Sequence, residues 1–124
     1  MEYLIVKRWT TEVSMFSIIS MRQLEVYLEQ KLDQGLDFTL LDVRSAQEFA
    51  NGHLLTAVNV PMDEEELWPG EWLEGVSVDI PVIVYCTHGS KSLMAARILD
   101  SKGYLVMAGA GGLASYRGKY YKSI

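Results

Sequence analysis

The chain contains one cysteine, Cys86, and the residues around it could support nucleophilic chemistry. Cys86 follows the apolar run 82–85 and precedes a polar stretch that leads into a helical pattern. A lone cysteine is most often an inert core residue, since free cysteine is among the most buried residue types. Here, however, the amides of a loop and of a helix N-terminus would converge near the sulfur and stabilise a thiolate. We therefore expect a reactive thiolate at Cys86, in a loop whose tight curl Gly89 permits.

Strand patterns and helix patterns alternate along the chain. Capping boxes that start at Ser20 and Ser45 predict two helix starts, and Gly35 predicts the end of the first helix. The apolar runs 38–43 and 82–85 predict strands that are buried on both faces. The other expected elements are a short strand at 3–6, a helix end at 51–52, a strand at 57–60, one helical turn at 64–68, a helix at 92–102, a strand at 104–107, a flexible loop at 109–112 and a final helix at 113–121.

This alternation is typical of the α/β class, in which helices cover both faces of a parallel sheet. We expect a small, doubly wound, mainly parallel five-stranded sheet with helices on both faces. A chain of 124 residues has the length of one domain. Residues 1–16 are expected to form an N-terminal extension with a possible strand, and residues 17–124 the domain. Because ligands bind at the carboxyl ends of parallel strands, the loop after Tyr85 is the expected site.

The charge distribution argues against some classes of partner. Sixteen acidic and eleven basic residues give a net charge of −5, which disfavours binding to nucleic acid or to an anionic membrane. No Lys or Arg occurs between Arg44 and Lys91, and acidic residues concentrate at 63–79. This acidic segment predicts either a solvated surface or a docking patch for a basic protein partner.

The single cysteine and the chain start indicate a compartment. Cys86 cannot form an intramolecular disulfide, so a reducing environment is expected. The start Met1–Tyr3 lacks the positive charge of a signal peptide, and no stretch reaches the roughly 18 apolar residues of a membrane helix. We therefore expect a cytoplasmic location.

Several segments, in order along the chain, resemble the rhodanese homology family. Leu40–Arg44 is similar to the family's L-x-D-V-R element, and Glu48–Phe49 to the acidic-aromatic pair that follows it. The other matching segments are 52–61, similar to G-H-I-x-G-A-x-N-I-P, Cys86–Ser92, similar to the active-site loop C-x-x-G-x-[RK]-S, and 111–116, similar to G-G-x-x-x-W. Thr56 replaces a usual glycine and Tyr116 a usual tryptophan, and both look like packing variants.

The resemblance implies a rhodanese-like, single-domain sulfurtransferase with no metal and no cofactor. Cys86 would accept a sulfane sulfur from thiosulfate or a protein persulfide, and would pass it to cyanide or a thiol. The implied substrate contacts are Thr87, His88, Gly89, Ser90, Lys91 and Ser92, with Lys91 adding a positive charge. The implied structural residues near the site are Asp42, Arg44 and His53, since charge-assisted hydrogen bonds are an adequate reason for such side chains.

Two other readings remain open. A non-catalytic rhodanese-like binding or sulfur-relay module would use the same fold, although members of that sort commonly lack the cysteine. A phosphatase or arsenate reductase needs the longer loop C-x5-R. In this chain the residue six places after Cys86 is Ser92 and not arginine. The positively charged residue, Lys91, comes one place earlier, so the loop is too short for the phosphatase hypothesis.

Overall fold

The structure is a computed structural model that describes residues 16–62, 68–74 and 76–123. Its five-stranded sheet has the order β1-β6-β5-β2-β4, and all neighbouring strands are parallel. The strands are β1 (Ser17–Ser20), β2 (Thr39–Asp42), β4 (Val58–Asn59), β5 (Val82–Tyr85) and β6 (Val106–Ala110), and the helices are α2 (Met21–Gln34), α3 (Ala46–Asn51) and α4 (Ser90–Ser101). The predicted α/β class and mainly parallel five-stranded sheet are confirmed.

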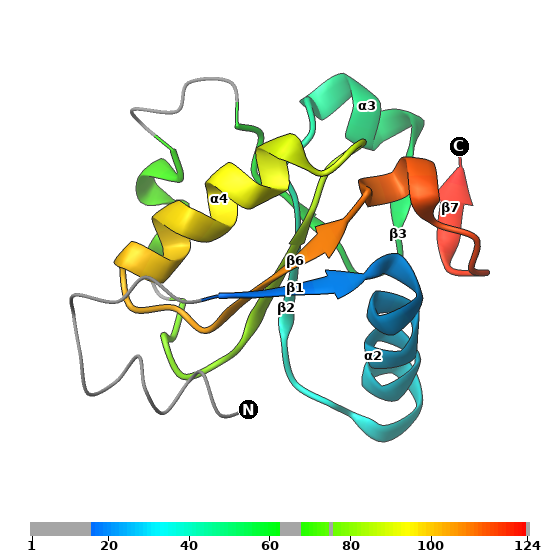
Figure 1. The fold of residues 1–124 in the computed structure, drawn as a ribbon, viewed down its shortest axis with the longest axis horizontal. Coiled ribbons are helices and arrows are strands. Elements are labelled where there is room, and N and C mark those ends of the chain that lie inside the picture. The colour runs from blue at the N-terminus through cyan, green and yellow to red at the C-terminus, as the bar shows by residue number, and fades with distance from the viewer. Residues whose placement is uncertain (1–15, 63–67, 75, 124) are drawn as a thin grey trace.

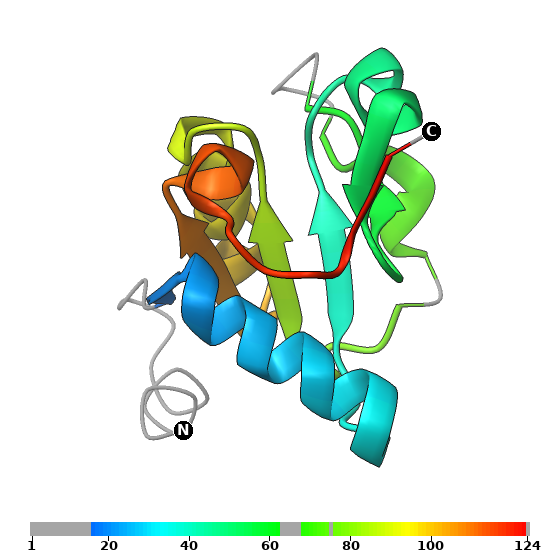
Figure 2. The same ribbon diagram turned by 90° about the vertical axis from the view of Figure 1, so that its right-hand side faces the viewer.

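Helices α2 and α4 pack on opposite faces of this sheet (Figures 1 and 2). Successive residues of a strand point to opposite faces, so each face receives alternate residues of β5. Val82 and Val84 belong to the core cluster that includes α4, and Ile83 and Tyr85 belong to the cluster that includes α2. The strand is apolar along its whole length because both of its faces are buried.

The helix ends follow the predicted signals. The Ser20 hydroxyl accepts a hydrogen bond from the backbone N–H of Gln23 at 3.0 Å, and Gly35 ends α2 at φ 72°. At the start of α3, Ser45 and Glu48 form both halves of a capping box. Both helix starts predicted from capping boxes are therefore confirmed.

The last parallel strand lies later in the chain than predicted. We expected a strand at 104–107 and a flexible loop at 109–112, but β6 runs from Val106 to Ala110 and includes Gly109. A side-chain carbon at Gly109 would lie 2.6 Å from the Met21 sulfur. Gly109 thus serves the close packing of α2 on the sheet, so here glycine marks a close approach and not a loop.

The predicted final helix at 113–121 is wrong. Only a 3-10 turn, η2 (Gly112–Ser115), forms, and β7 (Tyr121–Ser123) pairs antiparallel with β3 (Gly52–Leu54). The segment between them is held against α2, because Glu25 accepts hydrogen bonds from the Tyr116 hydroxyl and from the Lys119 backbone N–H. These hydrogen bonds and the pairing of β7 with β3 satisfy polar groups of this segment. The segment therefore does not need the hydrogen bonds of a helix.

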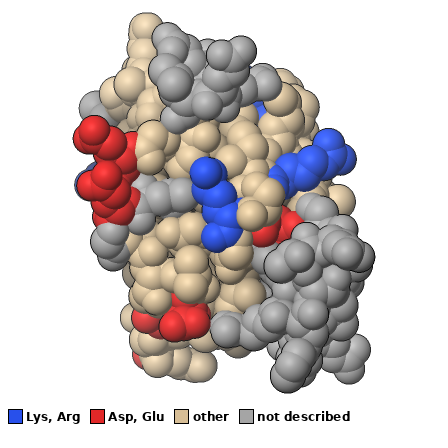
Figure 3. Space-filling view, turned by 90° about the vertical axis from the view of Figure 1, so that its left-hand side faces the viewer, with Lys and Arg blue, Asp and Glu red and all other residues tan. Residues whose placement is uncertain are grey.

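The acidic segment and the chain start lie partly outside the described residues. The strand expected at 3–6 and most of the turn expected at 64–68 fall there. The described part contains a 3-10 turn, η1 (Gly70–Leu73), and a buried Trp68 whose indole N–H donates to the Val60 carbonyl at 2.8 Å. Figure 3 shows the face that lies on the left in Figure 1. On this face Lys and Arg side chains lie among groups of Asp and Glu, so the face is not uniformly acidic. The acidic docking patch stays a prediction.

None of the helices in the described ranges is both long and apolar enough to span a membrane.

Candidate active site

The candidate site lies where two neighbouring strands end. Strands β2 and β5 are paired, with Asp42 opposite Tyr85, and the loops that follow them lead to α3 and α4. After β2 the chain continues to β4 on one side, and after β5 it continues to β6 on the other side. This divergence is the topological switch point at which parallel sheets bind ligands.

Cys86 directly follows β5, and a three-residue loop carries the chain from it to α4. We expected this helix to begin at Ser92, but it begins at Ser90, so Ser90 and Lys91 belong to its first turn and not to the loop. Gly89 precedes the helix with φ 109°, a backbone conformation that favours glycine. The loop is therefore shorter than predicted, and the helix N-terminus lies closer to the sulfur in sequence.

The sulfur of Cys86 accepts hydrogen bonds from two backbone N–H groups. The backbone N–H of Gly89 donates to Sγ at 3.0 Å and that of Ser92 at 3.4 Å. The thiol also lies 3.6 Å from the Ser92 hydroxyl, which itself donates to the Gly89 carbonyl at 2.9 Å. Amides that point at a sulfur, together with the positive end of a helix, stabilise its anionic form. This geometry suits a thiolate nucleophile.

A pocket of about 160 Å³ opens beside the sulfur. Its lining combines the loop after β5 with the residues after β2, namely Arg44, Glu48, Cys86, Thr87, His88, Ser90 and Lys91. Cys86 itself is only 3% exposed, whereas His88, Ser90 and Lys91 are exposed. The structure thus brings together most of the residues expected to contact substrate, and the backbone N–H groups of Gly89 and Ser92, which are not among the lining residues, donate to the sulfur.

The 3-10 turn η2 supports the loop from behind. The backbone N–H of Leu113 donates to the Cys86 carbonyl, and that of Ala114 to the Thr87 carbonyl, both at 2.9 Å. A side-chain carbon at Gly112 would lie 2.3 Å from the Cys86 carbonyl oxygen, and its φ is 58°. Glycine is therefore needed at this position both for its conformation and for the close backbone approach.

Arg44 and Asp42 form a buried ion pair beside the pocket. The guanidinium Nη2 lies 2.7 Å from Asp42 Oδ2 and also donates to the Gly52 carbonyl at 2.6 Å. Burial works against the charged guanidinium, but the hydrogen bonds and the charge of Asp42 outweigh it and raise the pKa of Arg44. Asn59 donates to the carbonyls of both residues, so the loop after β2 is fastened on two sides.

His53 is not among the residues that line the pocket. Its Nδ1 lies 2.8 Å from the Phe49 carbonyl, and its ring stacks on the Phe49 ring with centroids 3.7 Å apart. Through these contacts His53 joins β3 to α3. Among the described residues, no contact links His53 to Cys86.

Glu48 is a pocket residue for which the sequence predicts no role at the site. In the sequence it belongs to a capping box and to an acidic-aromatic pair. Its carboxylate Oε2 accepts a hydrogen bond from the Thr87 hydroxyl at 3.1 Å, which joins α3 to the loop after Cys86. The sequence signal that could have indicated a role for Glu48 at the site is its position shortly after β2, because β2 and β5 end at the same edge of the sheet.

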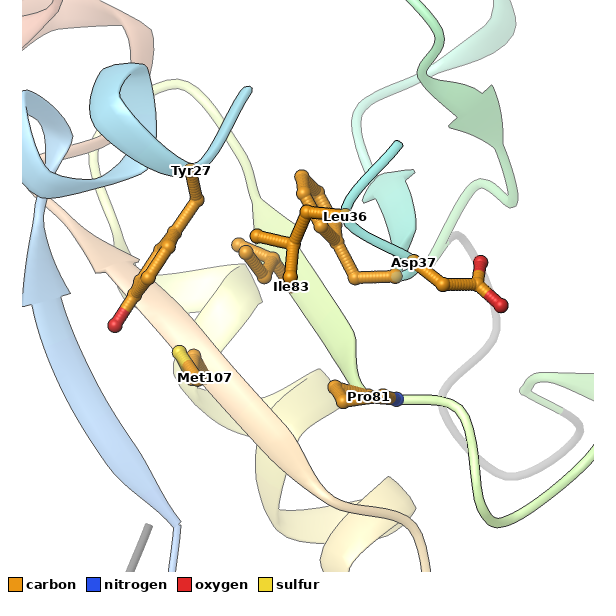
Figure 4. A pocket seen from close by; sticks show the side chains of 7 residues that line it. Tyr27, Leu36, Asp37, Pro81, Ile83 and Met107 are labelled. Atoms are coloured by element: carbon orange, nitrogen blue, oxygen red, sulfur yellow. The ribbon is translucent and has the colours of Figure 1, made fainter. Parts of the chain in front are cut away.

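A second pocket, of about 190 Å³, lies at the opposite ends of the strands (Figure 4). Its lining is mainly apolar and consists of Tyr27, Leu36, Asp37, Phe38, Pro81, Ile83 and Met107. None of these side chains is a nucleophile of the kind that Cys86 offers, so the chemistry of the molecule centres on the first pocket.

Comparison with known proteins agrees with this geometry. The family model described as Rhodanese-like domain matches residues 25–119. Thiosulfate sulfurtransferase GlpE of Pseudomonas putida (strain GB-1) is 32% identical over 97 residues, which cover 77% of this chain and 83% of that protein. A tRNA sulfurtransferase of Desulfurococcus amylolyticus is 37% identical over 81 residues, which cover 65% of this chain but only 15% of that longer protein.

A solved structure shares the fold. The crystal structure of a rhodanese-like domain protein from Staphylococcus aureus superposes with a TM-score of 0.70 at 20% identity, and the match covers 88% of this chain and 99% of that one. At this identity the likeness concerns the fold alone. The family model and the GlpE relative, by contrast, together cover most of the chain with recognisable sequence similarity. On this basis the chain belongs to the rhodanese-like domain family, and its relatives support a sulfurtransferase.

Proposed function

We propose that this protein is a sulfurtransferase that carries a sulfane sulfur on Cys86 as a persulfide. The observation that carries the proposal is the convergence of the Gly89 and Ser92 amides on the Cys86 sulfur at the base of an open pocket. A persulfide is an anion, and preorganised N–H donors stabilise an anion without reorganisation during the reaction. The named relatives supply independent support, because they are sulfurtransferases.

In the first half-reaction the Cys86 thiolate attacks the terminal sulfur of a donor such as thiosulfate. A sulfur–sulfur bond forms at Cys86 while the donor's own sulfur–sulfur bond breaks, and sulfite leaves with the electron pair of that bond. The product on the enzyme is the Cys86 persulfide, held by the two amides. Lys91, in the first turn of α4 and part of the pocket lining, supplies a positive charge to the anionic donor.

In the second half-reaction an acceptor removes the outer sulfur. Cyanide or a thiolate attacks that sulfur, the bond to Cys86 breaks, and the thiolate of Cys86 is regenerated as thiocyanate or a new persulfide departs. No oxidant or reductant is needed, because each step exchanges one nucleophile for another on the same sulfur. The reaction requires a reduced Cys86, so we propose a cytoplasmic location, where thiol reductants keep cysteines free.

The alternative on the same fold is a rhodanese-like module that binds a partner without catalysis. The two functions differ in whether Cys86 holds a sulfur atom between two half-reactions. The expected result is that thiosulfate adds the mass of one sulfur atom to the intact protein, and that cyanide removes it with release of thiocyanate. Cys86→Ser is expected to do neither, because a serine hydroxyl is not ionised at neutral pH and cannot form a persulfide.

Intact-protein mass spectrometry and a thiocyanate assay measure both steps, with circular dichroism as the check that each variant is folded. A folded wild-type protein that gains no sulfur from thiosulfate or from a persulfide donor would exclude the catalytic proposal and leave the binding module. Sulfur transfer by Cys86→Ser would exclude Cys86 as the carrier, since the chain has no other cysteine.

A further inference from the structure

The carboxylate of Glu48 is fixed at the pocket that contains Cys86. Its Oε1 accepts from the Ser45 backbone N–H at 3.3 Å and from the Ser45 hydroxyl at 3.1 Å. Its Oε2 accepts from the Thr87 hydroxyl at 3.1 Å. Three donors on two different loops therefore hold the carboxylate in one orientation, with Glu48 itself among the lining residues.

Glu48 carries a negative charge at neutral pH. Burial works against the ionised form, but the hydrogen bonds from Ser45 and Thr87 and the charge of Arg44 outweigh it and lower the pKa of Glu48. The side chain is nevertheless exposed at the pocket, so its charge faces whatever enters.

The charges of the lining nearly cancel. The charged lining residues are Arg44, Lys91 and Glu48. Arg44 is already paired with Asp42, which leaves one positive charge on Lys91 and one negative charge on Glu48. A site built for a dianion gains from excess positive charge, and the charged side chains of this pocket do not offer it.

The direction of attack places the remainder of the donor in the pocket that Glu48 helps to line. The terminal sulfur of the donor must reach Sγ of Cys86, a residue that is only 3% exposed, so the remainder of the donor lies toward the pocket opening. In thiosulfate that remainder is the sulfonate, whose charge is repelled by a carboxylate in the lining. In a persulfide the remainder is the carbon skeleton of the carrier, which has no sulfonate.

We propose that Glu48 is a specificity-determining residue that disfavours dianionic sulfur donors, so that the preferred donor is a persulfide with at most one negative charge at the reacting end. This inference rests on the proposed sulfurtransferase function. It goes further in naming the class of donor and the side chain that selects it.

Two small donors that differ by one charge test the proposal directly. Thiosulfate carries two negative charges, and methanethiosulfonate has a methyl group in place of one oxyanion and carries one. With either donor the Cys86 thiolate takes the outer sulfur, and sulfite or methanesulfinate leaves with the bonding electron pair. The quantity to measure is the ratio of kcat/KM for methanethiosulfonate to kcat/KM for thiosulfate, with cyanide as the acceptor.

In Glu48→Gln this ratio is expected to fall by about two- to fivefold, the range expected when one solvent-exposed charge interaction is removed. Glutamine can still accept the capping hydrogen bond at the start of α3, so the fold is expected to persist.

Asp33→Asn is the matched control. Asp33 is an exposed carboxylate near the end of α2 and does not line the pocket, so its loss changes the net charge equally but should leave the ratio unchanged. A ratio that is the same in Glu48→Gln and wild type, or that falls equally in Asp33→Asn, would overturn the proposed role of Glu48. If the wild-type protein accepts sulfur from neither donor and from no persulfide, the sulfurtransferase proposal itself fails.

Discussion

Both members of the ion pair between Asp42 and Arg44 are buried, and Asp42→Asn removes its negative member. Asp42 is fully buried and Arg44 is 7% exposed. Besides the contact between Nη2 and Oδ2, Arg44 Nε lies 3.1 Å and 3.0 Å from the two carboxylate oxygens, and the Arg44 backbone N–H donates to Oδ1 at 2.9 Å. The substitution leaves a guanidinium that cannot deprotonate facing a neutral amide.

The expected loss follows from the burial of both partners. Removing one member of a buried ion pair costs about 3–5 kcal/mol, because the other charge stays buried without compensation. Asparagine keeps an oxygen that can accept from the Arg44 backbone, and Nη2 keeps its bond to the Gly52 carbonyl. We therefore expect the lower end, a decrease of about 3 kcal/mol in the free energy of unfolding.

Urea denaturation followed by circular dichroism measures this decrease. Asp37→Asn is the control, since Asp37 is an exposed carboxylate close to the start of the same strand, and it should change stability by less than about 0.5 kcal/mol. In a double-mutant cycle with Arg44→Gln, the double variant should lose at least about 1 kcal/mol less than the sum of the single losses. A loss below about 1 kcal/mol for Asp42→Asn would refute the reasoning, because the pair would then behave like a surface contact.

Two further predictions concern the loop and the C-terminal segment. Lys91→Ala should lower kcat/KM for thiosulfate by about fivefold, whereas Lys91→Arg should retain most of this kcat/KM. An unchanged kcat/KM in the alanine variant would mean that the Gly89 and Ser92 amides suffice to bind the donor. Burial and the hydrogen bond to Glu25 raise the pKa of Tyr116, so the folded chain keeps that proton above pH ~10, where the unfolded chain loses it. The free energy of unfolding should therefore decrease as the pH rises above ~10, and this decrease should be smaller in Tyr116→Phe than in the wild-type protein. Urea titrations at a series of pH values measure both decreases, and equal decreases in the two proteins would contradict the prediction.

The elements that the sequence predicted well are those whose signals are local. The buried strand 82–85 needs only an apolar run bounded by Pro81 and the polar loop, and β5 has these bounds. The starts of α2 and α3 need only a hydroxyl and its partner three residues later. Such features require nothing from the distant chain, so a single sequence suffices to find them.

The elements that were predicted wrongly depend on partners far away in the chain. The segment after η2 was predicted to be helical, but Glu25 binds it at Tyr116 and Lys119, more than ninety positions later. The last residues of this segment pair with β3, and no local sequence pattern predicts that pairing. Gly109 likewise reads as a loop residue until the packing of Met21 against it is known.

The candidate site divides in the same way. The cysteine, the loop and the helix that follow β5 are contiguous, so their role could be inferred from residue types and order. Glu48 joins the site only because β2 and β5 are neighbours in the sheet, which brings Thr87 within 3.1 Å of a side chain 39 positions earlier. A negative charge that is fixed beside a nucleophile in this way alters which anions can approach it. The proposed selection of a donor is therefore a property of the sheet topology as much as of the loop. Substitution of Glu48 should change substrate preference while the contacts of the two amides with the Cys86 sulfur remain intact.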